Sequence, residues 1–364
     1  MRSEIGESNG TKPVGLLKPV TPTGLFGEPA LVIERLRVSL QVRKTHLEKV
    51  ARVDNETNEL FRRTKAFEEY VNERMQNLVD SHPTAPWFLR ISGCHRAIMG
   101  KLIWDVESFG KYYPAGDPMI PGYVTREPVE DEDKKLWVWV EGIERCMTPS
   151  KLRKYAGMIP DSKAVRGQLL SGNREFKSHL FRLSLFGFMM VKKRYYDQYV
   201  LYKNFKRIKF LADGWKILPT PKGRSCLTCE EEKKVPATTF YCPDCNTELS
   251  KKDEPEGILW EGHFDWMCRH KMIQLFLDHW WAVWREAAGL PLRVPYPMEY
   301  LGHTTLIDPW DMCDLPAPKE LPKRTAVKAE RAPRERKKVA SGKSQTAKPE
   351  ETPSESLLGP SHLD

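Results

Sequence analysis

The sequence contains no run of eighteen apolar residues, the length that a membrane-spanning helix requires. Its most apolar windows, such as 180–191, are too short and too often interrupted by charge to cross a bilayer. The N-terminus lacks a charged region followed by an apolar core, the pattern of a secretory signal. No internal repeat with a period of about 20 to 50 residues is visible. We therefore expect a cytoplasmic protein with no membrane partner.

Acidic residues are too few to balance the basic ones. The chain of 364 residues carries 58 Lys and Arg against 49 Asp and Glu, a formal net charge of +9. Such an excess favours an acidic partner, and nucleic acid is the commonest. The 11 Trp, 12 Tyr and 14 Phe indicate a real core with stacking surfaces rather than disorder, and the length allows two or three domains.

Cysteines are few, but half of them are clustered. Two CxxC pairs, separated by twelve residues, consist of Cys226, Cys229, Cys242 and Cys245. Four thiolates on two short turns match the tetrahedral set that Zn²⁺ prefers, with bonds of about 2.3 Å. Two disulfides or a redox CxxC are the alternative, but clustered cysteines in a reducing compartment more often bind metal. We predict a structural zinc ribbon, and we predict that the remaining cysteines are buried as small hydrophobes: Cys94, Cys146, Cys268 and Cys313.

The N-terminal part changes character near residue 28. Residues 1–27 are rich in Gly, Pro, Ser and Thr and predict a flexible arm. From 28 to 82, apolar residues recur at three- and four-residue steps with charges between them. This pattern predicts a long coiled-coil helix, or a helical hairpin broken near Asp54 and Asn55, with an ordinary core helix as the alternative. A coiled coil in turn predicts a homo-oligomer formed through residues 28–80.

A short turn between two helices is predicted at Ile91-Ser92-Gly93, in the manner of a helix-hairpin-helix. His95 stands where such a hairpin usually has its second glycine. Backbone N–H groups in this geometry suit phosphate, which makes Gly93 and His95 candidate DNA-binding residues. A plain packing corner explains the same residues. The acid-rich segment 112–135 is predicted to be a solvated loop rather than a carboxylate metal site.

Two basic helices follow. Thr148-Pro149 begins the first, and Gly157 with Pro160 ends it, whereas Leu136–Val140 is either a strand or a helix start. The second is predicted from Arg174 to Phe210, and its stretch 192–209 holds seven basic residues, one acid and interleaved aromatics. Such alternation suits a phosphate backbone with stacking contacts, although a solvated basic face with tyrosines packed inward is the alternative. The candidate phosphate contacts are Lys151, Arg153, Lys154, Lys192, Lys193, Arg194, Lys206 and Arg207.

The predicted fold is mainly α. A tryptophan-rich helix runs from Trp260 to Ala288, and from residue 315 onward apolar residues vanish, which predicts a disordered basic tail. The expected parts are an arm (1–27), a coiled-coil helix or hairpin (28–82), a helix-hairpin-helix-like domain (83–215), an inserted β zinc ribbon (216–259), a closing helix (260–314) and the tail (315–364).

Three segments carry a family resemblance. Residues 148–160 (Thr-Pro-Ser-Lys-Leu-Arg-Lys-Tyr-Ala-Gly-Met-Ile-Pro), Arg166-Gly167 and Ser171-Gly-Asn173 resemble the C-terminal domain of insertion-sequence transposases of the IS one-hundred-and-ten and one-hundred-and-sixteen group. That family's hairpin, K-L-x-x-Y-A-G segment, Gly-Asn turn and terminal helix occur here in the same order. The helix at 28–80 is similar to the family's coiled coil. The resemblance spans about residues 30–310.

The resemblance implies DNA transposition or recombination in a prokaryotic, nucleoid-associated setting, with DNA and a guide RNA as candidate partners. The family uses an N-terminal RuvC-like domain with four acidic metal ligands and a serine in the C-terminal domain. The segment before residue 28 is too short for that acidic domain. We therefore expect a partial or split transposase, with Mg²⁺ only if a partner supplies the domain. Ser162 has the approximate position of the family's serine, and Ser171 has the glycine beside it.

Three functions remain compatible with these residues. The first is charge-driven DNA binding by a transposase-type protein. The second is an active serine-dependent strand-transfer enzyme. The third is a zinc-stabilised coiled-coil scaffold for protein interactions, without catalytic activity.

Overall fold

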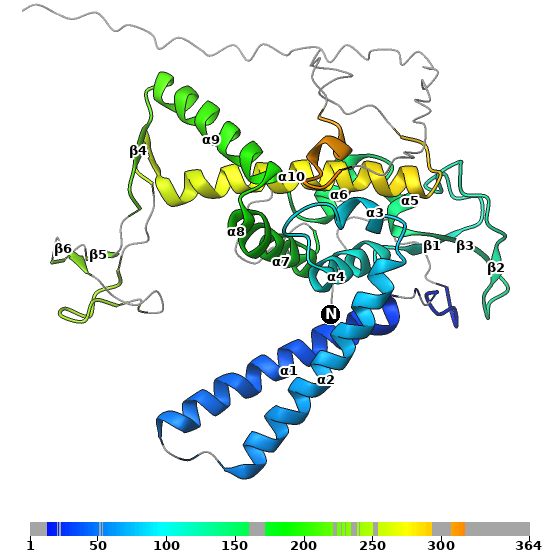
Figure 1. Cartoon of the computed structure of the whole chain (residues 1–364), viewed down its shortest axis with the longest axis horizontal. Helices are drawn as coiled ribbons and strands as arrows, with labels where there is room; N and C mark the ends of the chain where they lie inside the picture. The colour runs from blue at the N-terminus through cyan, green and yellow to red at the C-terminus, as the bar shows by residue number, and fades with distance from the viewer. Residues whose placement is uncertain are drawn as a thin grey trace, which may run out of the picture. The chain divides into compact units, whose positions relative to one another are not determined.

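The computed structural model describes residues 13–19, 21, 23–50, 52, 54–159, 172–220, 224–226, 228–229, 231–233, 239, 241–249, 254–292 and 307–316. The chain divides into two units, residues 1–327 and 328–364, and every described residue belongs to the first. This part is mainly helical (Figure 1). The predicted tail beyond residue 316 and both candidate serines, Ser162 and Ser171, lie outside the described residues.

The N-terminal helices form a hairpin, which decides between the two forms predicted for this segment. Helix α1 (Gly24–Lys49) and helix α2 (Asn55–Asp80) lie side by side (Figure 1). Asp54 caps α2 by accepting a hydrogen bond from the Thr57 amide, and an ion pair from Arg37 to Glu68 joins the two helices. The predicted arm was too long, because α1 already begins at Gly24 and not near residue 28.

The central helix of the described part is α10 (Glu261–Ala287), which contacts α5 (Gly142–Arg145), α6 (Pro149–Tyr155) and α9 (Arg194–Ala212) (Figure 1). Its apolar stripe meets helices α3 (Ala85–Phe88) and α4 (Arg96–Glu107) in one core. The rings of Trp87, Phe276 and Trp280 stack there and are fully buried. Each contributes roughly 2–3 kcal/mol by leaving water.

The acid-rich segment is largely the solvated loop that was predicted, since Glu127, Glu130, Glu132 and Asp133 are exposed, but parts of it also form strands. It contributes β1 (Lys111–Pro114) and β2 (Val129–Glu130), which pair antiparallel with β3 (Leu136–Val140) in the order β1-β3-β2. Asp131 is buried because its carboxylate accepts hydrogen bonds from the Trp137 indole at 2.7 Å and the Lys135 amide at 2.8 Å. These hydrogen bonds offset the cost of burying a carboxylate that the composition alone predicts to be exposed to water.

The predicted single helix from 174 to 210 is also wrong. Helix α7 (Arg174–Arg182) passes into a π-helical turn (Leu183–Phe188) and a short α8 (Met189–Val191). The chain then breaks at Lys192, whose φ of 51° is left-handed, and α9 starts in a new direction. A packing contact accompanies the π-helical turn: a Cβ on Gly187 would lie 2.6 Å from the carbonyl oxygen of Gly93.

The turn at 91–95 contains Gly93, the residue that packs against Gly187. Gly93 has φ 96°, and a Cβ there would lie 2.8 Å from the Gly187 carbonyl carbon. The Ser92 amide donates to Asp314 Oδ2 at 2.7 Å, while His95 stays exposed as the N-cap residue of α4. The turn therefore packs as a corner, the alternative that the sequence had left open.

The four cysteines outside the cluster lie in the protein interior. Cys94, Cys146, Cys268 and Cys313 are all buried, as predicted. None of the described helices is both long enough and apolar enough to cross a membrane.

Candidate functional site

The four clustered cysteines meet at one point. The sulfurs of Cys226, Cys229, Cys242 and Cys245 all lie within 4.8 Å of one another. Three of the separations are 3.3, 3.5 and 4.0 Å. A tetrahedron with bonds of 2.3 Å has edges of about 3.8 Å, so this donor set fits a single zinc ion.

Local backbone geometry brings each cysteine pair together. In the first turn the Cys229 amide points to Cys226 Sγ at 3.5 Å, just after β5 (Arg224–Cys226), which pairs with β6 (Glu231–Lys233). The second turn closes with the Cys242 amide donating to Thr247 O at 2.8 Å. A hydrogen bond from Thr247 lowers the pKa of the Cys245 thiol to about 6. An ionised thiol is the form that binds metal.

The ribbon has its own small core. Cys226, Cys242 and Leu249 are buried together with Cys229 against them, and none of the four belongs to the main core. The chain enters the ribbon from β4 (Lys216–Leu218) and returns through β7 (Ile258–Trp260), and these two strands pair in parallel. All four ligand positions are filled by sulfur, which leaves no open coordination position for water or substrate.

A second site forms where two of the resemblance segments meet. The Asn173 amide donates to Tyr155 O at 2.7 Å, and a Cβ on Gly172 would lie 2.6 Å from the Gly157 amide nitrogen. Gly172 has φ 95° and Gly157 has φ 65°, conformations that glycine adopts without strain. We call this contact the Tyr155–Asn173 junction. The chain leaves it at Ile159 and returns to it at Gly172, so both ends of the segment that carries Ser162 and Ser171 lie here.

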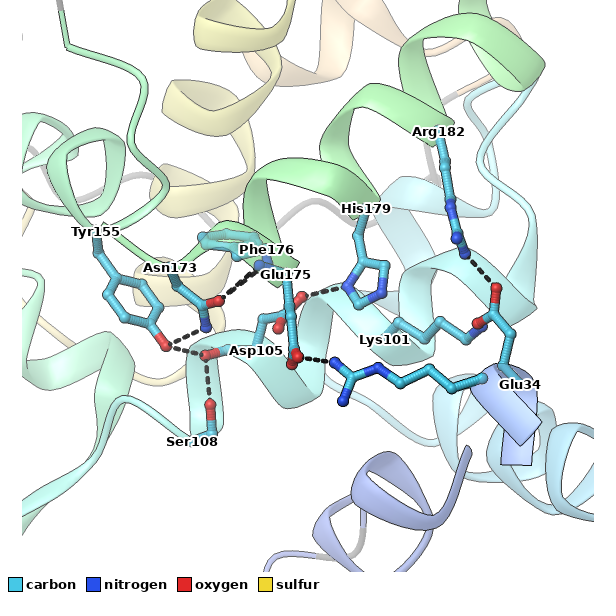
Figure 2. A network of polar contacts seen from close by, with 11 residues as sticks. Glu34, Lys101, Asp105, Ser108, Tyr155, Asn173, Glu175, Phe176, His179 and Arg182 are labelled. Atoms are coloured by element: carbon cyan, nitrogen blue, oxygen red, sulfur yellow. Dashed lines mark hydrogen bonds and ion pairs between the residues drawn. The ribbon is translucent and has the colours of Figure 1, made fainter. Parts of the chain in front are cut away.

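Side chains lock the junction from α4 (Figure 2). The Tyr155 hydroxyl donates to the carbonyl oxygen of Asp105 at 2.9 Å, and Asn173 Nδ2 donates to that hydroxyl at 3.0 Å. Ser108 Oγ donates to the same carbonyl oxygen of Asp105 at 2.8 Å. Asn173 Oδ1 accepts from the Phe176 amide at 3.2 Å and so caps α7. One asparagine therefore fixes both the turn and the start of the next helix.

A buried acid–base pair lies behind the junction. Asp105 Oδ2 is 2.7 Å from His179 Nδ1, and neither side chain is exposed to solvent by more than 4%. Burial raises the pKa of the Asp105 carboxyl, and the hydrogen bond to His179 only partly opposes the rise. Asp105 Oδ1 has no hydrogen-bond partner among the described residues. The pair ties α4 to α7 and so supports the junction in a fixed position.

Ion pairs extend this network to the hairpin. Glu34 on α1 binds both Lys101 on α4 and Arg182 on α7, and Arg35 binds Glu175 (Figure 2). Although burial raises the pKa of Glu34, its two cationic partners hold that pKa below its ordinary value. The hairpin is thus anchored to the same helices that support the junction.

The predicted basic face of α9 is divided in the structure. Lys203 pairs with Asp265 at 2.6 Å, Lys206 lies over the rings of Tyr202 and Phe210, and Arg207 lies over the ring of Phe264. Lys203 and Arg207 thereby turn towards α10, whereas the rings beneath Lys206 belong to α9 itself. The buried Tyr195 and Tyr199 agree with the inward-facing alternative. The exposed residues of α9 include four large apolar side chains: Leu201, Phe205, Ile208 and Leu211.

The other predicted phosphate contacts occupy two places. Lys151 and Lys154 are exposed on α6, while Arg153 forms an ion pair with Asp278 on α10. Lys192 and Lys193 are exposed at the break before α9, and the Arg194 guanidinium donates to Asp311 O at 2.6 Å.

Comparison of the chain with protein-family models, curated proteins and solved structures gave no match. The resemblance therefore rests on the motif residues themselves.

Sequence reasoning missed Asp105 and His179. A usable signal was present, because Asp105 lies between Ile103 and Val106 on the apolar stripe of a predicted helix. An acid on a buried stripe requires a partner. The identity of that partner, 74 positions further along, was not readable from the pattern.

Proposed function

We propose that this protein binds DNA and acts in DNA transposition or recombination, in the manner of the transposases that it resembles. The observation that carries the proposal is the Tyr155–Asn173 junction. It brings the Tyr-Ala-Gly segment and the Gly-Asn turn into one site. The Asp105–His179 pair supports that site by joining α4 to α7. Two motifs that only share an order in the sequence thereby form a single structural unit.

The junction suits a segment that presents a reactive group. Its two ends are held by backbone hydrogen bonding and by the close approach of Gly157 and Gly172. A serine nucleophile on such a segment needs a base or a metal to activate it. We expect that activation from an acidic domain on a partner chain, which would bring Mg²⁺. The four-cysteine site is closed, so we assign zinc a structural role only.

The binding part of the proposal is tested by salt. Affinity for duplex DNA, measured by fluorescence anisotropy, is expected to fall with a log–log slope of about 0.9 for each phosphate neutralised. A salt-insensitive affinity, or no binding at low salt, would refute it.

The strand-transfer part needs DNA ends and an acidic partner protein. We expect cleaved or covalently joined DNA that is lost in Ser171→Ala or Ser162→Ala and retained in the matched control Ser178→Ala, an exposed residue of α7. Product formation that survives both of the first two substitutions would remove these serines from the reaction.

A zinc-stabilised interaction scaffold is the second candidate function. Leu36 on α1 and Leu60 and Phe67 on α2 are about half exposed. Apolar side chains on the outside of a two-helix hairpin are typical of helices that pack against further helices. This candidate predicts self-association through residues 28–80 without DNA affinity at physiological salt, so the same anisotropy experiment separates the two.

A further inference from the structure

Positive charge gathers beside the junction from three helices. Arg153 lies on α6, Lys206 on α9 and Lys271 on α10, and α10 packs against both of the other helices. Burial lowers the pKa of Lys271, and the charges of Arg153 and Lys206 lower it further. We call these three residues the cationic cluster. Lys271 and its role were not apparent from the sequence.

The acid that the described residues place against this cluster is Asp278. Arg153 Nε lies 3.1 Å from Asp278 Oδ1, yet neither atom makes a hydrogen bond with a described residue. Burial raises the pKa of Asp278 to about 6, although Arg153 and Lys271 oppose the rise. A single carboxylate cannot balance the charge of three cations. The cluster is therefore short of negative charge.

The cluster adjoins the junction directly. Gln274 Nε2 donates to Met158 O at 2.7 Å, just before the chain leaves the junction at Ile159. Lys271, Gln274 and Asp278 recur at three- and four-residue steps and so share one face of α10. His270 precedes Lys271 on α10, and burial and the charge of Lys177 on α7 lower its pKa.

We infer that the cationic cluster is a phosphate-binding site and that the Asp278 carboxylate competes with phosphate for Arg153. A guanidinium presents paired N–H donors to phosphate oxygens, and lysine adds a mobile point charge. The ligand is a phosphodiester of the DNA backbone if the proposed function holds, on which this choice of ligand rests. Free phosphate offers the same chemistry.

The direct test substitutes the cluster in the full chain. Arg153→Gln and Lys271→Gln are each expected to weaken duplex binding about tenfold at low salt, as loss of a charged hydrogen bond does. Each is also expected to reduce the salt slope by about 1. Lys209→Gln, on the exposed side of α9, is the matched control and should change little. Although Lys271 is crowded enough for burial to lower its pKa, its side chain still reaches solvent, so Lys271→Gln keeps the test open if Arg153→Gln fails to fold.

Competition by Asp278 has its own signature. Wild-type affinity is expected to fall as pH rises through about 6. Asp278→Asn should bind DNA more tightly than the wild type at pH 8, and the two proteins should bind with similar affinity at pH 5. His270 and Lys177 contribute equally to both proteins, so the difference between them isolates Asp278. Equal affinities at pH 8 would overturn the competition.

Failure of the inference is distinguishable from failure of the proposed function. If the wild type binds DNA and the cluster variants match Lys209→Gln, the proposed function stands and the phosphate site is refuted. If no DNA binds, inorganic phosphate is titrated while the melting temperature is followed. A rise that Lys271→Gln abolishes supports the site with free phosphate as its ligand, and a rise shared by all variants refutes it.

Discussion

Removing one zinc ligand should unfold the ribbon and leave the helical core folded. Cys242 is 2% exposed and belongs to the ribbon core, which shares no residue with the main core. A structural zinc contributes roughly 10–16 kcal/mol to the folding of small zinc-binding modules. Burial of Leu249, the apolar member of the ribbon core, contributes only about 2 kcal/mol. We expect Cys242→Ser to leave the ribbon without enough stabilisation to fold.

Elemental analysis measures the zinc content of each variant, and hydrogen exchange measures which helices and strands remain folded. The wild type should carry one zinc per chain and Cys242→Ser none. Amide exchange should rise in residues 224–249, while α4 and α10 keep the protection of the wild type. Cys268→Ser is the matched control, because Cys268 is equally buried but lies in the main core. That variant should keep its zinc while its melting temperature falls.

Two outcomes would refute this reasoning. If exchange in α10 rose together with exchange in the ribbon, the two cores would be one cooperative unit. If zinc were lost without any change in 224–249, the metal would not hold the ribbon.

Three further predictions follow from other sites. Gly172→Ala should lower the free energy of unfolding, measured in denaturant, by about 2–4 kcal/mol, because the new Cβ would overlap backbone 2.6 Å away and the positive φ is strained for alanine. Gly116 has a similar φ but no described atom within 4 Å of such a Cβ, so Gly116→Ala should cost only about 1 kcal/mol. Asp278 has a pKa raised from 3.8 to about 6, so its native form binds the extra proton; stability should fall by on the order of 3 kcal/mol as pH rises from 4 to 6, and Asp278→Asn should flatten that dependence. Replacing Leu60 and Phe67 by serine should reduce self-association in analytical ultracentrifugation, and a wild type that is monomeric at high concentration would contradict this.

Local patterns gave the parts that were predicted correctly. The four-cysteine cluster follows from spacing alone, and Thr148 accepts a hydrogen bond from the Lys151 amide as its position before Pro149 predicts. The long pattern at 28–82 allowed a hairpin because Asp54 and Asn55 interrupt it. In each case, residues within a few positions of one another decide the structure.

Contacts between distant segments decided the rest. The helix predicted over 174–210 breaks at Lys192, and its π-helical turn packs Gly187 against Gly93, which lies 94 positions earlier. Lys203 and Arg207 of α9 fold onto α10 because its acid and its aromatic ring offer them partners. The buried Asp131 also accepts a hydrogen bond from the amide of Val14, 117 positions earlier, at 3.4 Å. Charge counted along the chain did not reveal where those charges point.

The parallel pairing of β4 with β7 has a consequence for engineering. Lys216 lies level with Ile258 and Leu218 with Trp260, so the whole span between the strands starts and finishes at one small place on the protein. A module attached in this way can be exchanged without stretching its host, because surface segments with neighbouring ends tolerate replacement. A flexible Gly-Ser linker, or an unrelated small domain with adjacent termini, should substitute for 219–257. The contribution of the ribbon to any activity could then be measured by comparing the wild type with the variant that lacks the ribbon.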